Sequence, residues 1–313
     1  MPILRCSKLA TGALLAKLTM GAGLGCEMRK FLIMTGALLG ALLLPAAAGA
    51  PQHAKSQFAL FQQKTIFKSG LPRAHTIALT FDDGPNAHTA EVLDALKEAN
   101  VKATFFIVGK QAHKNPKLLA RIAAEGHLLA NHSADHELLG ARFDAAPERL
   151  LAELRDVDQQ IKPLMKHGDK LYFRAPYGSR KSAHAEILNG DQRLRNYIGP
   201  IFWDVGGDIT MRDGYVMSAA DWDCWHTHWS AQTCAKGYLR EVRRKDGGVE
   251  LMHCIHLNSA ALVRAVVPAL IEEGYSFVRL DQMPEYRQYE TPGAVNGIAR
   301  AGDLSRFARM AVK

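Results

Sequence analysis

The stretch Thr76-Ile77-Ala78-Leu79-Thr80-Phe81-Asp82-Asp83-Gly84-Pro85 decides how this chain folds and where its chemistry lies. Its apolar run is typical of a buried strand, and Gly84-Pro85 indicates a turn directly after that strand. Two adjacent carboxylates at the end of a buried strand are costly unless something uses their charge. The stretch therefore predicts a functional site at the carboxyl end of the strand.

The same pattern recurs along the chain, where strand-like runs alternate with helical patterns. The predicted strands are 76–81, 103–108, 127–131, 171–175, 200–205, 249–253 and 276–280. The predicted helices are 88–99, 116–125, 147–162 and 259–273. This alternation predicts an α/β fold with parallel strands. At this length an irregular, TIM-like (β/α)7-type barrel is the first expectation, and an open doubly wound sheet is the second. The stretch 206–235 lacks clear periodicity and is expected to be a functional or capping loop.

Every polar candidate follows one of these strands. The candidates are Asp82 and Asp83 after the first strand, His132 after the third, Arg174 after the fourth, Asp204 and Asp208 after the fifth, and His253 after the sixth. Barrel enzymes assemble their sites from loops at the carboxyl ends of the strands. We therefore expect these side chains to converge on one face.

Three of the candidates form a metal-ligand set. His132 and His136 are four residues apart, one helical turn, so both can point at a single ion. Asp83 is the natural third ligand, and a two-histidine, one-carboxylate set leaves room for a water. The same set also suits non-heme iron oxygenases, but those sites have no use for the second acid, Asp82.

Asp82 is left to act as a general base toward a water whose pKa a metal lowers. Arg174 is expected to be buried and paired with Asp82, which would tune that base. The turn Pro176-Tyr177-Gly178 would aim a backbone N–H at a developing oxyanion. His253 could protonate a leaving amine, and Asp204 or Asp208 could keep it charged.

These motifs resemble those of the polysaccharide deacetylase family (carbohydrate esterase family four) over about residues 75–280. The motifs that carry the resemblance occur in the family's order: Thr80-Phe81-Asp82-Asp83-Gly84-Pro85, His132-Ser133-Ala134-Asp135-His136, Arg174-Ala175-Pro176-Tyr177-Gly178, Trp203-Asp204 with Asp208, and Leu251-Met252-His253. The resemblance implies an irregular (β/α) barrel and a divalent metal, most of all Zn²⁺, with Co²⁺, Fe²⁺, Mn²⁺ and Ni²⁺ as alternatives.

The resemblance also implies the reaction and the roles of the residues. It implies hydrolysis of N-acetyl groups on an N-acetylglucosamine-containing polysaccharide or oligosaccharide, with release of acetate. The implied base is Asp82, the implied ligands are Asp83, His132 and His136, the residue that tunes the base is Arg174, and the acid is His253. Tyr177, Trp203 and Leu251 fall in the substrate and oxyanion part of the site.

Two departures from the family pattern keep rival functions open. The fourth motif usually reads Asp-x-x-Asp-Trp, but Trp203-Asp204 and Asp208 lack that final Trp. Many relatives place Asp after the last histidine, where this chain has Cys254. The rivals are an O-acetyl esterase of the xylan type and a catalytically weak carbohydrate-binding protein of the same fold.

The segment 221–229 holds three of the four Trp residues and is expected either to stack on sugars at the cleft rim or to form a small core that caps the barrel. Cys224 and Cys234 are expected to form a disulfide in an oxidising compartment.

The first 50 residues are expected to be a secretory signal peptide, because Arg29-Lys30 precedes an uncharged apolar run and small residues follow it. Met28 is a candidate true start, and a retained anchor is the alternative. Residues 51–74 are expected to be a leader, 75–285 the catalytic domain and 286–313 a tail. The protein is then exported, to the periplasm or beyond.

The charge balance limits the classes of binding partner that the sequence favours. Residues 1–50 hold five basic residues and one acid out of 39 and 31 in the chain, so the remainder is only mildly basic. This balance gives no case for a nucleic-acid partner. No stable protein partner is expected.

Overall fold

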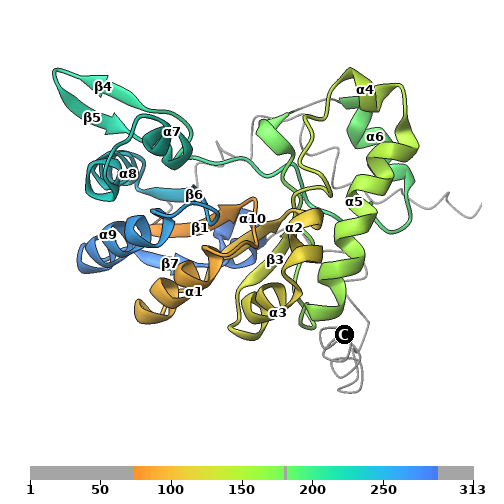
Figure 1. Ribbon diagram of the computed structural model, residues 1–313, viewed down its shortest axis with the longest axis horizontal. Coiled ribbons are helices and arrows are strands. Elements are labelled where there is room, and N and C mark those ends of the chain that lie inside the picture. The colour runs from red at the N-terminus through yellow and green to blue at the C-terminus, as the bar shows by residue number, and fades with distance from the viewer. Residues whose placement is uncertain (1–73, 180–181, 288–313) are drawn as a thin grey trace, which may run out of the picture. The chain divides into compact units, whose positions relative to one another are not determined.

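The computed structural model describes residues 74–179 and 182–287, which form a parallel sheet surrounded by helices (Figure 1). The strands are β1 (Thr76–Asp82), β2 (Thr104–Ile107), β3 (Leu128–Asn131), β4 (Thr210–Arg212), β5 (Tyr215–Ser218), β6 (Gly247–His253) and β7 (Ser276–Val278). The longer helices are α1 (Thr89–Glu98), α3 (Pro116–Ala124), α5 (Pro147–Ile161), α6 (Ser182–Gly190), α8 (Ala231–Lys245) and α9 (Ser259–Glu272). The shorter ones are α2 (Gly109–Lys114), α4 (Ala141–Asp144), α7 (Asp221–His226), α10 (Pro284–Arg287) and the 3-10 turns η3 (Lys162–Leu164), η4 (Pro176–Gly178) and η5 (Leu280–Gln282).

The predicted signal peptide, nearly all of the leader and most of the tail lie outside the described residues. Within the described ranges, no helix combines the length and the apolar character that a membrane crossing needs.

Strand β1 is the centre of the main sheet, in the order β3-β2-β1-β6 with β7 also paired to β1. β6 pairs in parallel with β1 along its whole length and sets Asp82 opposite His253. β2 pairs with β1 at Thr80 and Phe81, and β7 pairs with it over 76–78. Because β6 occupies one edge of β1 throughout, β2 and β7 share the other edge.

The expected α/β fold with parallel strands is confirmed, and the barrel is irregular. Beyond β3 the sheet continues only through single parallel bridges, Asn131 to Phe173 and Tyr172 to Ile198, and Val205 bridges back to Glu250 on β6. Among the described residues no continuous ladder closes the circle.

Two predicted strands, 171–175 and 200–205, are therefore wrong as strands, although both segments line the barrel as bridges. A proline limits each segment at one end, because Pro176 directly follows the first and Pro200 begins the second, and neither has an N–H to donate to a neighbouring ladder.

The predicted helices are confirmed to within about two residues at their ends. α1 buries Val92, Leu93 and Leu96, the face that its spacing indicated. α3 and α5 each begin at a proline in the first turn, where the missing N–H costs nothing. These helices cover a sheet whose central strand is buried almost throughout.

The stretch 206–235, expected to be a loop, instead holds an antiparallel hairpin of β4 and β5, the helix α7 and the start of α8. Its periodicity is hidden because each element is only three to six residues long before α8 begins. Ser230 caps α8 by accepting a hydrogen bond from the N–H of Thr233. Figure 1 shows the hairpin beside α7 and α8, away from the helices that follow β2 and β3.

Candidate active site

The candidate active site contains two carboxylates at the end of β1. Asp82 is the last residue of the strand and only 3% exposed. Consecutive side chains on a strand point to opposite faces, yet Asp82 and Asp83 line the same cleft. The backbone of Asp83 has φ 72°, and this left-handed turn brings the second carboxylate round to the side of the first.

His132 and His136 converge on Asp83. The Nε2 atoms of His132 and His136 lie 3.4 Å and 3.1 Å from Oδ1 of Asp83. The expectation that one helical turn aligns them is wrong, because residues 132–136 form a loop. Ser133 and His136 both have positive φ, and the Ser133 hydroxyl accepts the His136 N–H.

The donor atoms of this cluster fit a cation. Nδ1 of His132 lies 2.7 Å from the carbonyl oxygen of Arg174, so it must donate, and this bond turns Nε2 toward Asp83. Oδ1 of Asp83 is buried and has no aligned hydrogen bond among the described residues. Two imidazole nitrogens and a carboxylate oxygen at this spacing need a positive charge among them, which either a proton on an imidazole or a bound cation supplies.

The three groups are also compact, since one ligand atom from each of Asp83, His132 and His136 lies within 4.8 Å of the others. Burial by itself raises the pKa of Asp83, but the imidazoles of His132, His253 and His136 outweigh it and hold that pKa well below its ordinary value. Asp83 is therefore ionised at neutral pH, the state that a metal ligand needs.

Arg174 holds the other carboxylate, Asp82. Its guanidinium is fully buried, lies over the ring of Phe106 at 4.0 Å, and donates to Asp82 Oδ1 at 2.6 Å. It also donates to Thr80 Oγ1 and to the carbonyl oxygen of Ile201. Arg174 thus fixes the rotamer of Asp82 and compensates its charge.

His253 lies across the cleft at the end of β6. Its Nε2 is 4.0 Å from Asp83 Oδ2, and its Nδ1 is 2.8 Å from Oδ1 of Asp221. The second oxygen of Asp221 accepts the backbone N–H of His253. Burial lowers the pKa of His253, but Asp221 and the two strand-end acids outweigh it and raise that pKa to about 9.

The expectation that Asp204 or Asp208 pairs with His253 is wrong, because Asp221 occupies that position. Asp204 Oδ2 accepts the N–H of Val249, near the start of β6, and Asp208 is exposed on a different cavity. Both acids lie on a segment that leaves the cleft before the hairpin, so neither carboxylate reaches the end of β6.

The remaining predicted site residues line the cleft, a cavity of about 570 Å³. The side chain of Tyr177 is 69% exposed and its ring lies 4.8 Å from that of His136. Trp203 and Leu251 contribute to the walls. Trp222, 48% exposed, stands on the rim.

The tryptophan-rich segment divides between its two expected roles. Trp222 lines the cleft, whereas Trp225 and Trp229 pack against the hydrophobic core. The structure joins Cys224 to Cys234, both fully buried, with their Cα atoms 5.9 Å apart. The disulfide ties α7, which carries Trp222, to α8.

Cys254 lies beneath the turn at Gly84 and not beside the imidazole of His253. Its sulfur contacts the Thr89 hydroxyl and the carbonyl oxygen of Asp82. A Cβ on Gly84 would lie 2.4 Å from that sulfur. Burial raises the pKa of the thiol to about 12, so Cys254 is a neutral packing group.

The residue that sequence reasoning missed is Asp221. The pair Asp221-Trp222 supplies the Asp-Trp ending that the fourth family motif requires. The signal was present, but the interpretation started from Trp203-Asp204 and stopped before the hairpin that separates the two segments.

Comparison with known proteins supports this geometry. A protein-family model described as polysaccharide deacetylase matches residues 70–191. The chain is 49% identical over 209 residues to a chitooligosaccharide deacetylase of Rhizobium leguminosarum bv. trifolii, covering 66% of this chain and 90% of the relative. It is 33% identical over 241 residues to a peptidoglycan-N-acetylglucosamine deacetylase of Bacillus cereus, covering 74% and 81%. The solved structure of the peptidoglycan deacetylase PdaC from Bacillus subtilis matches with a TM-score of 0.53 at 25% identity, covering 77% of this chain and 99% of that one.

Proposed function

This chain belongs to the polysaccharide deacetylase family, and from that premise we propose that it removes N-acetyl groups from an N-acetylglucosamine-containing polysaccharide and releases acetate. The observation that carries the proposal is the separation of two adjacent acids. Asp83 faces the Nε2 atoms of two imidazoles, while Asp82 is held apart by Arg174. One acid is free to hold a cation and the other to move a proton.

Asp83, His132 and His136 would hold a divalent metal ion. Two imidazole nitrogens and one carboxylate oxygen suit Zn²⁺ best, and Co²⁺, Fe²⁺, Mn²⁺ and Ni²⁺ remain alternatives. The ion would supply Lewis acidity toward the acetyl carbonyl and lower the pKa of a nearby water.

The protein's own residues carry the proton transfers. Asp82 takes a proton from the attacking water as the new C–O bond forms at the acetyl carbon, and Arg174 keeps its carboxylate in position. The backbone N–H of Tyr177 donates to the oxyanion.

His253, charged at neutral pH because its pKa is about 9, then donates a proton to the nitrogen as the C–N bond breaks. The products are acetate and a free amine on the sugar. Asp221 orients the ring and compensates the charge of His253.

The geometry at His253 favours an amide over an ester as substrate. An amine needs a proton in order to leave, whereas an alkoxide depends on one less, and here the proton donor is fully supported by Asp221. The two reasons for considering a non-catalytic carbohydrate-binding protein no longer hold. Asp221 supplies the acid that orients His253, and the Cys254 thiol packs away from the imidazole of His253.

Export to the periplasm or beyond is part of the proposal. A buried disulfide is typical of proteins that fold in an oxidising compartment, and a polysaccharide of the cell envelope lies there. The proposed catalytic domain spans 75–285.

The test is acetate release by the full chain from a panel of chitooligosaccharides, peptidoglycan and acetylated xylan. We expect release from the N-acetylated glycans, its loss after treatment with a chelator, and its return on adding Zn²⁺ or another divalent metal. Release from none of these glycans by the metal-loaded protein would overturn the proposal.

A His253→Ala variant separates the two acetyl chemistries. It should lose more activity on the amide substrates than on acetylated xylan. Equal losses on both would contradict the amide assignment.

A further inference from the structure

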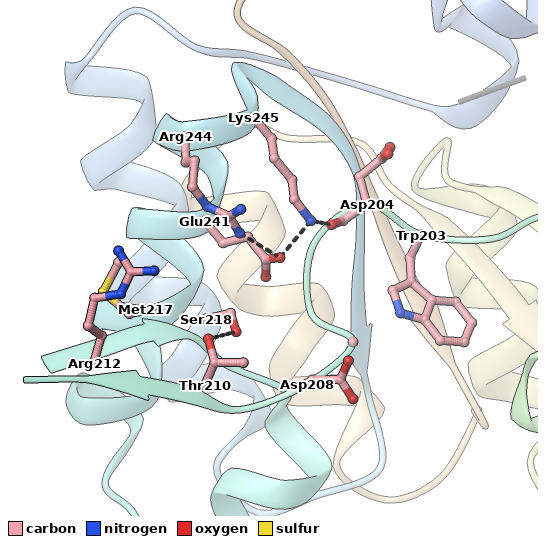
Figure 2. Close-up of a pocket in the computed structure, with 11 residues that line it drawn as sticks. Trp203, Asp204, Asp208, Thr210, Arg212, Met217, Ser218, Glu241, Arg244 and Lys245 are labelled. Atoms are coloured by element: carbon pink, nitrogen blue, oxygen red, sulfur yellow. Dashed lines mark hydrogen bonds and ion pairs between the residues drawn. The ribbon is translucent and has the colours of Figure 1, made fainter. Parts of the chain in front are cut away.

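A second cavity, which the deacetylation chemistry does not use, adjoins the candidate active site (Figure 2). Its volume is about 480 Å³, within the range of about 300–1,000 Å³ that is usual for ligand pockets. Its walls are the segment 203–208, the hairpin of β4 and β5, and the last two turns of α8. Asp204 and Asp208, the acids that did not reach His253, lie here.

The two cavities share a wall. Trp203 and Gly207 line both the catalytic cleft and the second cavity. A Cβ on Gly207 would lie 2.6 Å from Nε1 of Trp203, so only glycine lets the indole lie against the backbone there. The two cavities therefore adjoin at Trp203, which a glycan with its acetamido group beside Asp83 would pass to reach the second cavity.

Two of the three acids that line this cavity already accept hydrogen bonds from other groups of the protein. Glu241 accepts hydrogen bonds from Lys245 Nζ at 2.6 Å and from the backbone N–H of Gly206 at 3.2 Å. Asp204 accepts the N–H of Val249, and Figure 2 shows its carboxylate directed away from the other side chains of the cavity.

The guanidinium groups of the two arginines that line this cavity make few contacts with the rest of the protein. The backbone of Arg212 pairs with Tyr215 in the hairpin, but its exposed guanidinium makes no hydrogen bond or ion pair with the residues that the structure describes. Arg244 makes only a long contact, 3.4 Å, with Glu241, which Lys245 already neutralises, and its side chain is 57% exposed. Both keep donors available for an outside acceptor.

Charge is distributed unevenly along the cavity. Figure 2 shows Arg212 and Arg244 at the end formed by the hairpin and α8, whereas Asp208 lies toward Trp203. The end far from the catalytic cleft is therefore cationic. A planar guanidinium binds a carboxylate through two parallel N–H donors, which a neutral hydroxyl cannot match.

We propose that this cavity is an accessory subsite that binds a carboxylate-bearing substituent of the glycan, with Arg212 and Arg244 as its anion-binding residues. The inference rests on the proposed function and deepens it, because it assigns the enzyme an acidic glycan over a neutral one. The hairpin supplies Arg212 and is the element that builds the outer wall.

The experiment compares two tetrasaccharides of alternating N-acetylglucosamine and N-acetylmuramic acid, one with free carboxylates and one with the same carboxylates amidated. Acetate release is measured with the metal-loaded full chain and with Arg212→Gln, Arg244→Gln and the double variant. Arg243→Gln is the matched control, since Arg243 is a neighbour on α8 that pairs with Glu273 and does not line the cavity.

We expect the wild type to have a lower KM for the free acid than for the amide. The double variant should raise KM for the acid about tenfold, the size of one charge-assisted contact at a partly exposed site, with kcat unchanged. KM for the amidated sugar should not move, and Arg243→Gln should match the wild type on both sugars.

Equal KM values for the two sugars in the wild type would overturn the subsite while leaving deacetylation intact. The same conclusion would follow if Arg243→Gln had the same effect as the double variant. If neither sugar is deacetylated, calorimetric titration decides the subsite alone: tighter binding of the free acid that the double variant abolishes supports it, and equal binding of the two sugars overturns it.

Discussion

The two walls of the catalytic cleft are assembled from different elements of the fold. One, the metal wall, consists of Asp82, Asp83, His132 and His136, which follow strands β1 and β3 in the same half of the sheet. The other, the acid wall, consists of His253 and of Asp221, which supports it, and Glu250 is buried three residues before His253 on β6. There His253 at the end of β6 meets an acid 32 positions earlier, at the start of α7.

The walls also differ in how their buried charges are compensated. Each carboxylate of the metal wall faces an imidazole or a guanidinium. Next to the acid wall, Glu250 is fully buried and neither of its carboxylate oxygens has a partner among the described residues. The difference indicates that every buried carboxylate of the metal wall has a cationic or imidazole partner. Next to the acid wall, by contrast, the Glu250 carboxyl group is buried without a partner in the described part of the chain, close to the pair Asp221 and His253.

The comparison is tested most strongly at Asp82, which we expect to be the base. Asp82→Asn keeps the shape and the contact with Arg174 but removes the proton acceptor. We expect kcat for acetate release to fall about 10³-fold, within the range typical of general bases. Asp135→Asn is the control, because Asp135 is an exposed acid beside the same ligands; a loss of similar size there would point to general electrostatics and contradict the role of Asp82.

The acid wall is tested by Asp221→Asn, which should lower kcat on amide substrates about 10²-fold because His253 loses the group that keeps it charged. Asp208→Asn should change kcat by less than about threefold, since that residue lies in the neighbouring cavity. Comparable losses in the two variants would contradict the assignment of Asp221.

Glu250 gives a smaller effect, on stability. Burial and the nearby acids Glu241 and Asp221 raise its pKa to about 8 from an ordinary 4.5. Between about pH 4.5 and 8 the folded chain holds a proton that the unfolded chain has lost, so stability falls as pH rises through that window. Glu250→Gln has no proton to lose and should be more stable than the wild type at pH 8, by on the order of 2 kcal/mol.

Thermal unfolding at pH 5 and pH 8 measures this directly. The gain from Glu250→Gln should shrink at pH 5, and Glu241→Gln should be destabilising because it breaks the contact with Lys245. A gain for Glu250→Gln that is independent of pH would rule out ionisation as its cause.

The sequence predicted the metal wall well because its residues sit at the ends of strands whose apolar runs are unmistakable. Asp82 ends β1, Asp83 directly follows it, and His132 directly follows β3. The spacing could not predict the backbone conformation between His132 and His136. The two side chains converge because the segment is a loop with residues of positive φ, and not because it is a helical turn.

The acid wall was predicted only in part, because Asp221 follows a hairpin whose strands are three and four residues long. A three-residue strand such as β4 leaves no periodicity to read, so the hairpin looked like an irregular loop and hid the link from Trp203 to Asp221. The segments 171–175 and 200–205 look like strands by composition, yet they make only isolated bridges.

The most direct test of the whole account is the metal content of two variants of neighbouring acids. The account predicts that purified wild-type chain binds one divalent ion, that Asp83→Asn loses it, and that Asp82→Asn keeps it while releasing almost no acetate. Elemental analysis that finds the ion retained in Asp83→Asn, or lost in Asp82→Asn, would contradict the division of roles between the two carboxylates.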